Sequence, residues 1–327
     1  MTGTAGRRSR KTVWPASAAA GLAMDAIFGD DPLRPHPVAL YGRAMQAVEA
    51  SLYDDTKGRG VEYALAGIGL ALIAGRILEV VPCGAGATAA SYTAIAGRGL
   101  WAAAAGVGEA LELGELERAR GLLPALVGRD ATHLDESGIV RAAVESVAEN
   151  TVDGIVAPAL FASGGGAAGV LGYRALNTLD SMVGHRSDRY RHFGWASARL
   201  DDAANFVPAR VTALLVALVR PAAARRIWRA VRHDAPAHPS PNAGVAEAAF
   251  AAALGLRLGG TNSYGGRVEE RPPLGPASGR APKPPDIARA IACSRHVTAA
   301  LFTLLAGAAA ATATATAAAG AERRAER

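Results

Sequence analysis

Acidic and amide side chains recur at helical spacing between positions 141 and 205, each time at the edge of an apolar run. In the first group, Arg141, Glu145 and Glu149 are four apart, and Asp153 follows at the same step before a glycine. Residues four apart share one face of a helix. This face would carry a cation and up to three carboxylates, which suits it to a metal ion or a phosphorylated ligand.

Two further groups follow. Asn177 and Asp180 are three apart, while Asp201 and Asn205 are four apart with Asp202 beside the first. Carboxylates beside apolar helices are costly to desolvate unless they pair with cations or hold a metal. Interleaved arginines could supply the cations: Arg174, Arg186, Arg189, Arg199 and Arg210. We therefore expect a site that binds polyphosphate through Mg²⁺ and arginine. The alternative is a set of solvated helix ends joined by weak surface ion pairs.

Two proline-containing loops hold further candidates. His36 lies among Pro32, Pro35 and Pro37, which forbid a regular helix, and could act as a proton shuttle, a phosphate ligand or a structural histidine. Arg43 is expected to open the next helix and to contact an anion. In HPSPNAG, Ser240 and Asn242 precede a helix expected over 245–256, and either side chain could cap that helix.

The elements that must position these residues are helices. Periodicity predicts an amphipathic helix after residue 108 and a new helix starting near Asp135 or Ser137, and alternating patterns never exceed a few residues. Residues 266–285, rich in proline, glycine and arginine, are expected to form a flexible surface loop. Several apolar runs are candidate membrane spans: 13–28, 63–81, 85–105, 155–171, 206–219 and 297–321.

Composition agrees with an all-α, polytopic integral membrane protein of four to six spans. Hydrophobic residues make up 50% of the 327 residues and aromatic residues only 5%, as in closely packed membrane helices, although a soluble helical protein is the competing interpretation. The net charge of +6 indicates anionic lipid or phosphorylated substrates, since nucleic-acid-binding motifs are missing. One basic run is interpreted as the flank of a membrane helix, or else as an additional polyanion site: Arg220, Arg225, Arg226, Arg229 and Arg232.

Several long segments resemble the hallmark blocks of the CobD/CbiB family, the adenosylcobinamide-phosphate synthases of cobalamin biosynthesis. The blocks are GDDPLRPHPVALYGR, VESVAENTVDGIVAP, YRALNTLDSMVGHR, FGWASARLDDAANFVPAR and HPSPNAGVAEAAFAAALGLRLGG. They stand in the family's order and cover most of residues 25–265, although tyrosine is expected more often where His185 stands. The resemblance implies one membrane domain over residues 1–327, with a motif-bearing core at about 25–265 and a C-terminal hydrophobic helix at 297–321.

The resemblance also implies a reaction. Such enzymes join aminopropanol, or its O-phosphate, to the free propionate of adenosylcobyric acid in an ATP-dependent amide-forming ligation. The expected cofactors are ATP and Mg²⁺, and the corrinoid is a substrate. The expected partners are the lipid bilayer and other late membrane enzymes of the corrinoid pathway, with no nucleic acid. The protein would be a multi-pass protein of the cell membrane, with amphipathic and loop segments forming an active site on the cytoplasmic side, where ATP is found.

The candidate residues divide by role. Catalytic roles are assigned to Glu145, Glu149, Asp153, Asp180, Asp201, Asp202 and His36. The predicted Mg²⁺ ligands are Glu149, Asp153, Asp180, Asp201 and Asp202. Substrate or phosphate binding is assigned to Arg43, Arg141, Asn150, Arg174, Asn177, Arg186, Arg199, Asn205, Arg210, Ser240 and Asn242.

Two alternatives remain open on the residues alone. Asn and Asp clusters also hold Mg²⁺-diphosphate in intramembrane prenyltransferase-like enzymes, but such an enzyme would need a tunnel lined with large apolar side chains, which this alanine-rich chain offers sparingly. A non-enzymatic carrier or membrane partner in corrinoid metabolism would need polar residues deep within paired helices, whereas here they gather at helix ends.

Overall fold

The chain folds into two compact units that alternate along the sequence. The computed structural model describes residues 3–29, 33, 35–128, 132–185, 187–264 and 267–325. Unit 1 comprises Met1–Ile95, Ala157–Ala204 and Leu301–Arg327, and unit 2 comprises Ala96–Val156 and Asn205–Ala300. The described chain is mostly helical, as the periodicity predicts.

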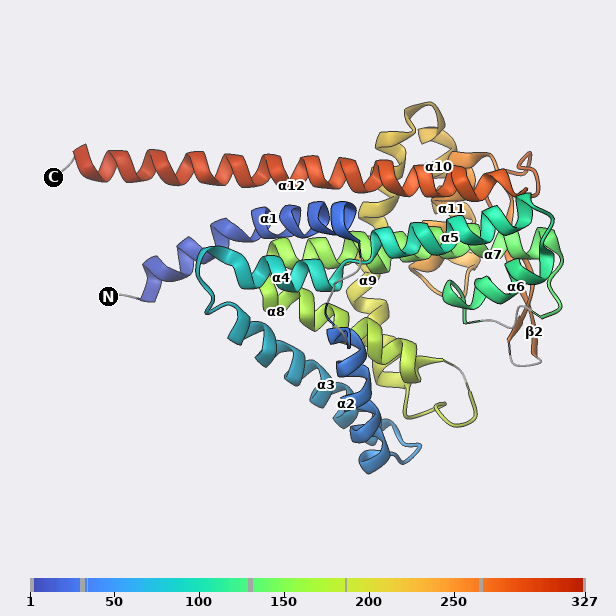
Figure 1. The fold of residues 1–327 in the computed structure, drawn as a ribbon, viewed down its shortest axis with the longest axis horizontal. Coiled ribbons are helices and arrows are strands. Elements are labelled where there is room, and N and C mark those ends of the chain that lie inside the picture. The colour runs from blue at the N-terminus through green and yellow to red at the C-terminus, as the bar shows by residue number, and fades with distance from the viewer. Residues whose placement is uncertain are drawn as a thin grey trace. The chain divides into compact units, whose positions relative to one another are not determined.

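Unit 1 is a helical assembly around α8, which contacts α1, α3 and α4 (Figure 1). The N-terminal apolar run predicted as a helix lies within α1. Each of the next two helices begins at a side-chain cap, because His36 precedes α2 and Thr56 precedes α3. The elements of this unit are α1 (Gly3–Phe28), α2 (Pro37–Leu52), α3 (Lys57–Leu78), η1 (Pro82–Gly84), α4 (Ala85–Ala94), α8 (Ala157–Leu179), η4 (Asp180–Gly184), the first part of α9 (Trp195–Val219) and the last part of α12 (Pro285–Ala325).

Small residues let the helices of unit 1 approach each other closely. A Cβ atom on Gly75 of α3 would overlap the Cα atom of Ala168 in α8, and a Cβ atom on Gly21 of α1 would overlap the side chain of Ser91 in α4. Glycine at such crossings brings two backbones into contact, which is the usual way in which membrane helices pack. The abundance of small residues in the sequence therefore has a direct structural use.

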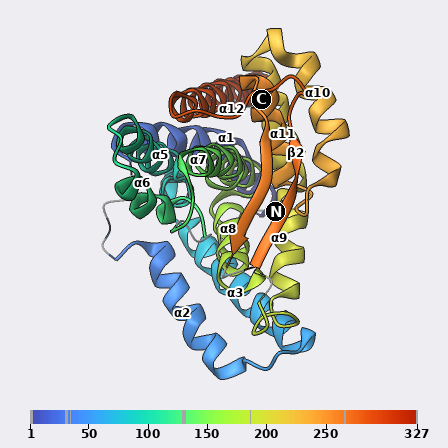
Figure 2. The same cartoon turned by 90° about the vertical axis from the view of Figure 1, so that its right-hand side faces the viewer.

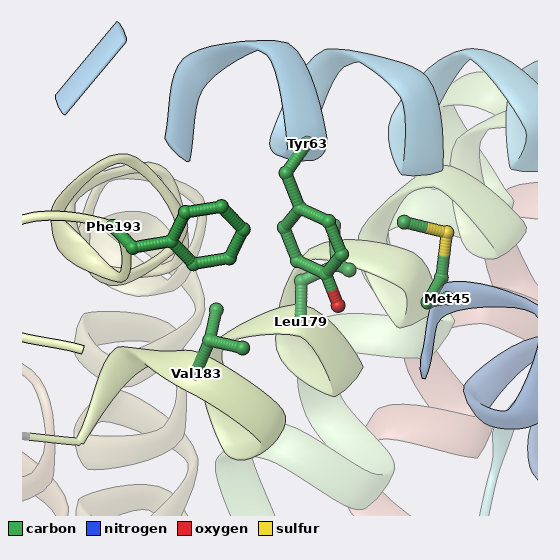
Figure 3. Close-up of a cluster of buried hydrophobic side chains, with 5 residues drawn as sticks. All are labelled: Met45, Tyr63, Leu179, Val183 and Phe193. Carbon is green, nitrogen blue, oxygen red and sulfur yellow. The ribbon is translucent and has the colours of Figure 1, made fainter. Parts of the chain in front are cut away.

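A buried cluster closes one end of unit 1. Figure 3 shows Tyr63 and Phe193 against Leu179, Val183 and Met45, and none of these five side chains is more than 1% exposed. The two rings are tilted, with centroids 5.1 Å apart. This cluster fixes the end of α8, which carries the candidate residue Asn177, and the start of η4, which carries Asp180.

Unit 2 is built around α7 and α11, both almost fully buried. As predicted, α7 begins after Asp135, whose Oδ1 accepts the N–H of Gly138 at 2.7 Å. Helix α11 ends at Gly255 in the left-handed conformation. The elements of this unit are α5 (Gly97–Glu112), α6 (Leu116–Leu122), η2 (Leu123–Ala125), α7 (Glu136–Thr151), η3 (Val152–Val156), the rest of α9, η5 (Pro221–Ala223), α10 (Ala224–His233), η6 (Ala235–Ala237), α11 (Ala243–Leu254), β1 (Leu258–Tyr264), β2 (Arg267–Leu274) and the start of α12.

An antiparallel hairpin packs beside α11 (Figure 2). Strand β2 lies within the segment 266–285, so the expectation of an irregular loop is wrong for residues 267–274. Prolines and glycines hid the strand pattern, and a bulge at Leu258–Gly260 breaks the alternation of side chains. Gly259 and Gly260 lie at this bulge with positive φ angles.

Two candidate carboxylates lie in π-helical turns. Asp153 lies in η3, between α7 and α8, and Asp180 lies in η4, directly after α8. One wide turn inserted in a helix is often found at a functional site. The structure thus marks two of the sequence-derived candidates by an independent feature of the backbone.

In the described part of the chain, four helical segments are long and apolar enough to cross a membrane, which indicates a multi-pass membrane protein. They are Lys57–Leu78, Glu136–Gly184, Trp195–Val219 and Pro285–Ala319. The predicted run 13–28 is a shorter apolar helix. The prediction of one span over 85–105 is wrong, because the helix breaks between Ala94 and Gly97, where the N–H of Ala96 bonds to the carbonyl of Gly154 at 2.9 Å.

Candidate functional site

In unit 1, a guanidinium, an amide and a carboxylate meet between α8 and α9. Arg174 donates to Oδ1 of Asn177 at 3.4 Å, and the amide nitrogen of Asn177 donates to Oδ1 of Asp201 at 3.5 Å. Arg174 and Asn177 are partly buried and Asp201 is 8% exposed. The sequence placed these residue types in separate groups, and the structure brings them into one chain of contacts, here called the Arg174 triad.

An apolar cavity of about 170 Å³ adjoins the Arg174 triad. Arg174 lines it together with Leu171 and Thr178 of α8, Leu70 of α3 and Tyr41 of α2. Burial, and to a lesser extent the neighbouring Tyr63, raises the pKa of Tyr41 above its usual value, so this phenol stays neutral. The guanidinium therefore stands where an apolar cavity meets a polar cluster.

The other unit 1 candidates lie near the same helix ends. Asp180 and Asp202 are partly buried, and Arg199 is exposed on the first turns of α9. Arg186 lies outside the described residues. Among the candidate arginines that the structure describes in unit 1, Arg174 is therefore partly buried, whereas Arg199 is exposed.

In unit 2, the pair predicted from helical spacing is present. Nε of Arg141 lies 4.0 Å from Oε1 of Glu145, which also accepts the N–H of Gly259 at 3.0 Å. Gly260 packs against the guanidinium, because a Cβ atom there would lie 2.7 Å from Nη1 of Arg141. Glu145 is only 4% exposed. This carboxylate thus joins α7 to the bulge of β1.

A second buried group lies in unit 2, and the sequence analysis missed it. Nε2 of His238 lies 2.9 Å from Nη1 of Arg271 on β2 and 3.7 Å from Oε1 of Glu247 on α11. The side chains of His238 and Glu247 are 1% and 2% exposed. We call His238, Glu247 and Arg271, together with Arg141 and Glu145, the buried network.

The contacts of His238 define its protonation. Nδ1 lies 3.1 Å from both the carbonyl oxygen and the N–H of Ser240. A guanidinium can only donate, so Nε2 accepts from Arg271, which assigns the proton to Nδ1 and makes the Ser240 carbonyl its acceptor. Burial is the main reason that the pKa of His238 lies below its usual value, and the charge of Arg271 lowers this pKa further. The hydrogen bond to the Ser240 backbone and the charge of Glu145 act in the opposite direction and raise it. The imidazole is therefore neutral near pH 7.

One signal in the sequence could have found part of this network. Glu247 is the only charged residue in the helical segment AGVAEAAFAAAL. A carboxylate alone in an apolar helix needs a buried partner. No comparable signal marks Arg271, because 33 residues separate it from His238 along the chain.

A third arrangement joins α9 to the loop before α11. Arg210 donates to Oδ1 of Asn242 at 2.9 Å and to the carbonyl of Pro241 at 3.3 Å. Oγ of Ser240 accepts the N–H groups of Asn242 and Ala243, at 3.3 and 3.1 Å, so Ser240 caps the start of α11. Within the described ranges, no carboxylate lies within 4 Å of the Arg210 guanidinium. Arg210 therefore has a charge that a bound anion could neutralise.

The remaining candidates are less central. Nδ1 of His36 accepts the N–H of Val38 at 3.2 Å and caps α2, which is a structural role. Arg43, expected to open α2, lies in its second turn and is exposed.

On α7, Glu149 is exposed although Glu145 is buried. Residues four apart advance by about 40° more than one full turn, so successive members leave the common face. Asn150 donates to the backbone and hydroxyl of Ser146, at 3.0 and 3.1 Å. On α9, Asn205 is 2% exposed.

In the described chain, the predicted Mg²⁺ ligands do not form a cage of protein carboxylates. Among the described residues, no three His, Cys, Asp or Glu side chains converge on one point. Mg²⁺, however, is commonly held by one or two carboxylates together with substrate phosphates, and rarely by a cage of protein ligands alone. Asp201, beside Arg174 and Asn177, fits this smaller requirement, while the full predicted ligand set stays a prediction.

Comparisons with known proteins agree with the resemblance. The family described as CobD/Cbib protein matches residues 18–294. The chain is 47% identical to cobalamin biosynthesis protein CobD of Mycobacterium tuberculosis over 286 residues, which cover 85% of this chain and 90% of the relative. It is 42% identical to CobD of Geobacter metallireducens, over 77% and 83% of the two chains. It is 50% identical to CobD of Rhodobacter capsulatus, over 59% and 61%. No solved structure matches.

Proposed function

Because the chain belongs to the CobD/CbiB family of cobalamin biosynthesis proteins, we propose that it forms an amide bond between the free propionate of adenosylcobyric acid and the amine of aminopropanol or its O-phosphate. The main support for this proposal is the extent of the match to the family, because the matched residues 18–294 contain every candidate site residue from His36 to Asn242. The protein would thus be an ATP-dependent adenosylcobinamide-phosphate synthase.

The chemistry requires activation of a carboxylate. A propionate oxygen attacks the γ-phosphorus of ATP, which gives an acyl phosphate and ADP. The amine then attacks the acyl carbon, inorganic phosphate leaves, and the nitrogen loses a proton to a base. Charge on the transferred phosphoryl group must be stabilised by cations and hydrogen-bond donors that are already in position.

The Arg174 triad supplies groups of this kind. Arg174 can donate two parallel hydrogen bonds to phosphate oxygens, and Asn177 keeps it oriented at 3.4 Å. Asp201 would hold a nucleotide-borne Mg²⁺, with Asp180 or Asp202 as a further carboxylate. When bound, this ion neutralises phosphate charge. The triad thus supports a phosphate-binding role for α8 and the start of α9.

Unit 2 offers a second anion contact. Arg210 is held by Asn242 and the carbonyl of Pro241, and its charge is not matched by a carboxylate in the described chain. We assign Arg210, Asn242 and Ser240 to a phosphate or carboxylate group of a substrate. Glu149 or Asp153, less buried than Glu145, would accept the proton of the amine. His36 is another candidate for this base, because its helix cap uses only Nδ1 and Nε2 could accept the proton.

The placement follows from the substrate. The four long apolar segments indicate a multi-pass protein, and ATP is found in the cytoplasm, so we place the reaction at the cytoplasmic face. Membership of a cobalamin biosynthesis family favours this reaction over prenyl transfer. A carrier or partner role in corrinoid metabolism remains the second candidate that an experiment must separate.

The test is turnover by the detergent-purified protein with ATP, Mg²⁺, adenosylcobyric acid and either aminopropanol or its O-phosphate. Mass spectrometry should detect the amide product and ADP with wild type, and neither above background with Asp201→Asn. Comparing the two amines identifies the acceptor. A wild-type protein that binds the corrinoid and forms no product with either amine would contradict the ligase proposal and favour a carrier.

A further inference from the structure

Helix α10 in unit 2 presents a strongly basic outer face. Arg225, Arg229 and Arg232 follow each other at spacings of four and three, and Arg226 lies beside them, so the four side chains share one side of the helix. All four are exposed. The opposite side buries Ile227 and Ala230, and α10 packs on α11 (Figure 2). We call the exposed side the arginine face.

The arginine face is not neutralised by the protein. In the part of the chain that the structure describes, no carboxylate lies within 4 Å of any of its four guanidinium groups. Elsewhere on the surface the exposed arginines Arg59, Arg76 and Arg118 each pair with a glutamate three residues away. A group of four like charges without internal partners costs electrostatic free energy unless an anionic surface or counterions face it.

The position of α10 in the chain identifies that surface. The preceding helix α9 exposes an apolar stripe, Val207, Leu214 and Leu218, each more than half exposed. Such a stripe is suited to lipid acyl chains, and α9 is one of the four segments long enough to cross a membrane. Helix α10 begins five residues after the end of α9. Even a fully extended chain of that length spans roughly 18 Å at most, and the turn η5 within it shortens the distance between the two helix ends. The arginine face therefore starts at the level of the lipid headgroups.

An aromatic residue on the edge of this face has the same preference. The indole of Trp228 is 39% exposed, between the arginine face and the buried side of α10. Tryptophan concentrates at the boundary between the acyl chains and the headgroups, because its ring is apolar and its N–H is a donor. Arginine side chains bind phosphate oxygens through two parallel N–H groups.

We infer that the arginine face of α10 docks on the anionic headgroup layer of the bilayer and anchors unit 2 there. The occupant is a phospholipid surface with net negative charge, and the contact is electrostatic. Each arginine near such a surface favours binding by roughly fivefold at low salt, and the contribution falls as ionic strength rises. This inference goes beyond the proposed reaction and does not depend on it.

The test uses the fluorescence of Trp228 in full-length protein, reconstituted in nanodiscs that contain phosphatidylcholine and phosphatidylglycerol. Bromine atoms, which quench nearby tryptophans, are carried on the acyl chains of one lipid or of the other. The Trp228 signal is the difference between wild type and Trp228→Phe. We expect brominated phosphatidylglycerol to quench the Trp228 signal at least twofold more than brominated phosphatidylcholine at the same mole fraction. Salt at 1 M, which shortens the screening length to about 3 Å, should remove this preference.

Two sets of variants test the cause. Replacing Arg225, Arg226, Arg229 and Arg232 by glutamine should make the two lipids quench equally, while replacing the same four by lysine should keep the preference. Trp195, 42% exposed in unit 1, is the matched control. Its signal, obtained with Trp195→Phe, should not change when the α10 arginines are replaced.

Three outcomes would overturn the inference: equal quenching of Trp228 by both lipids in wild type, no quenching by either, or an unchanged preference in the glutamine variant. A fourth would reassign the face to a soluble polyphosphate, namely a change in Trp228 fluorescence on adding ATP in phosphatidylcholine nanodiscs, without lipid preference. The wild-type comparison decides by itself should the glutamine variant not fold, and Arg229→Gln then tests the cause with one charge removed.

Discussion

The Arg174 triad of unit 1 and the buried network of unit 2 both place arginine beside an acidic side chain, but in different surroundings. In the Arg174 triad, the two hydrogen bonds are 3.4 and 3.5 Å long and the guanidinium lines a cavity. In the buried network, Arg271 donates to Nε2 of His238 at 2.9 Å and Gly259 donates to Glu145 at 3.0 Å. The ion-pair contacts Arg141–Glu145 and His238–Glu247 are longer, at 4.0 and 3.7 Å. Glu145, His238 and Glu247 are all buried. Polar groups beside a cavity can exchange partners with a ligand, whereas buried polar groups that bond to a neighbouring backbone or strand hold the fold.

The two units also differ in what holds them together. In unit 1, backbones touch at glycines such as Gly75, and an aromatic and aliphatic cluster closes one end. In unit 2, Glu145 and His238 tie α7 and the loop before α11 to the hairpin. We therefore expect polar substitutions to affect stability mainly in unit 2 and activity mainly in unit 1.

The largest effect is expected at Glu145. Glu145→Ala removes the acceptor of the Gly259 N–H and leaves Arg141 without this carboxylate, so the free energy of unfolding should fall by about 3 kcal/mol. Denaturant unfolding in detergent measures it. The control is Glu112→Ala at the exposed end of α5, for which the change should stay below about 0.5 kcal/mol. Equal losses of unfolding free energy in the two variants would contradict a structural role for the buried network.

Arg174→Gln should act on the reaction instead. Loss of one preorganised cation beside a phosphoryl group lowers kcat by on the order of a hundredfold, which is about 2.7 kcal/mol of transition-state stabilisation. Steady-state kinetics measures it, and the unfolding midpoint should stay close to that of wild type. Arg199→Gln, at an exposed position on α9, should change kcat by less than about threefold, because solvent screens a charge at an exposed position. A fully active Arg174→Gln enzyme would exclude the triad from the site.

Packing in unit 1 is tested by two glycines of the same helix. In Gly75→Ala, the new methyl group would overlap the Cα atom of Ala168, so the substitution should lower the free energy of unfolding by roughly 2 kcal/mol. Gly69→Ala has nothing within 4 Å of the new methyl and should be neutral or stabilising by up to about 1 kcal/mol. Unfolding of both variants in the same detergent gives the comparison, and a harmless Gly75→Ala would mean that α3 and α8 can separate there.

The smallest effect depends on pH. The pKa of His238 in the folded protein lies below the ordinary value of 6.5, so the unfolded chain binds this proton more readily. The stability that neutral His238 contributes is present above pH 6.5 and is lost as the pH falls towards the folded pKa. Unfolding midpoints at pH 7.5 and 5.5 should differ less in His238→Gln than in wild type. His233→Gln, exposed on α10, should keep the wild-type difference.

The helices were predictable because their signals are local. The periodicity and the cap at Asp135 placed α7, and most of the apolar runs lie in helices, the run at 85–105 being divided between α4 and α5. The hairpin was not predictable, because β1 and β2 contain glycines and prolines and their pairing depends on a partner strand. The break at Ile95 and Ala96 was also hidden, since the contact that fixes it, the carbonyl of Gly154, is remote in the sequence.

The candidate site divides in the same way. Residue types and spacing alone selected Arg174, Asn177 and Asp201, and long matching blocks identified the family. Only the tertiary structure decided which candidates meet: Asn177 reaches Asp201 across 24 residues, Glu145 reaches Gly259 across 114, and His36 became a helix cap. A sequence determines which groups a helix face carries, because that periodicity is local. Which two faces touch depends on packing between distant segments, so the pairing of charges, and with it the division between binding and structural roles, was decided by the fold.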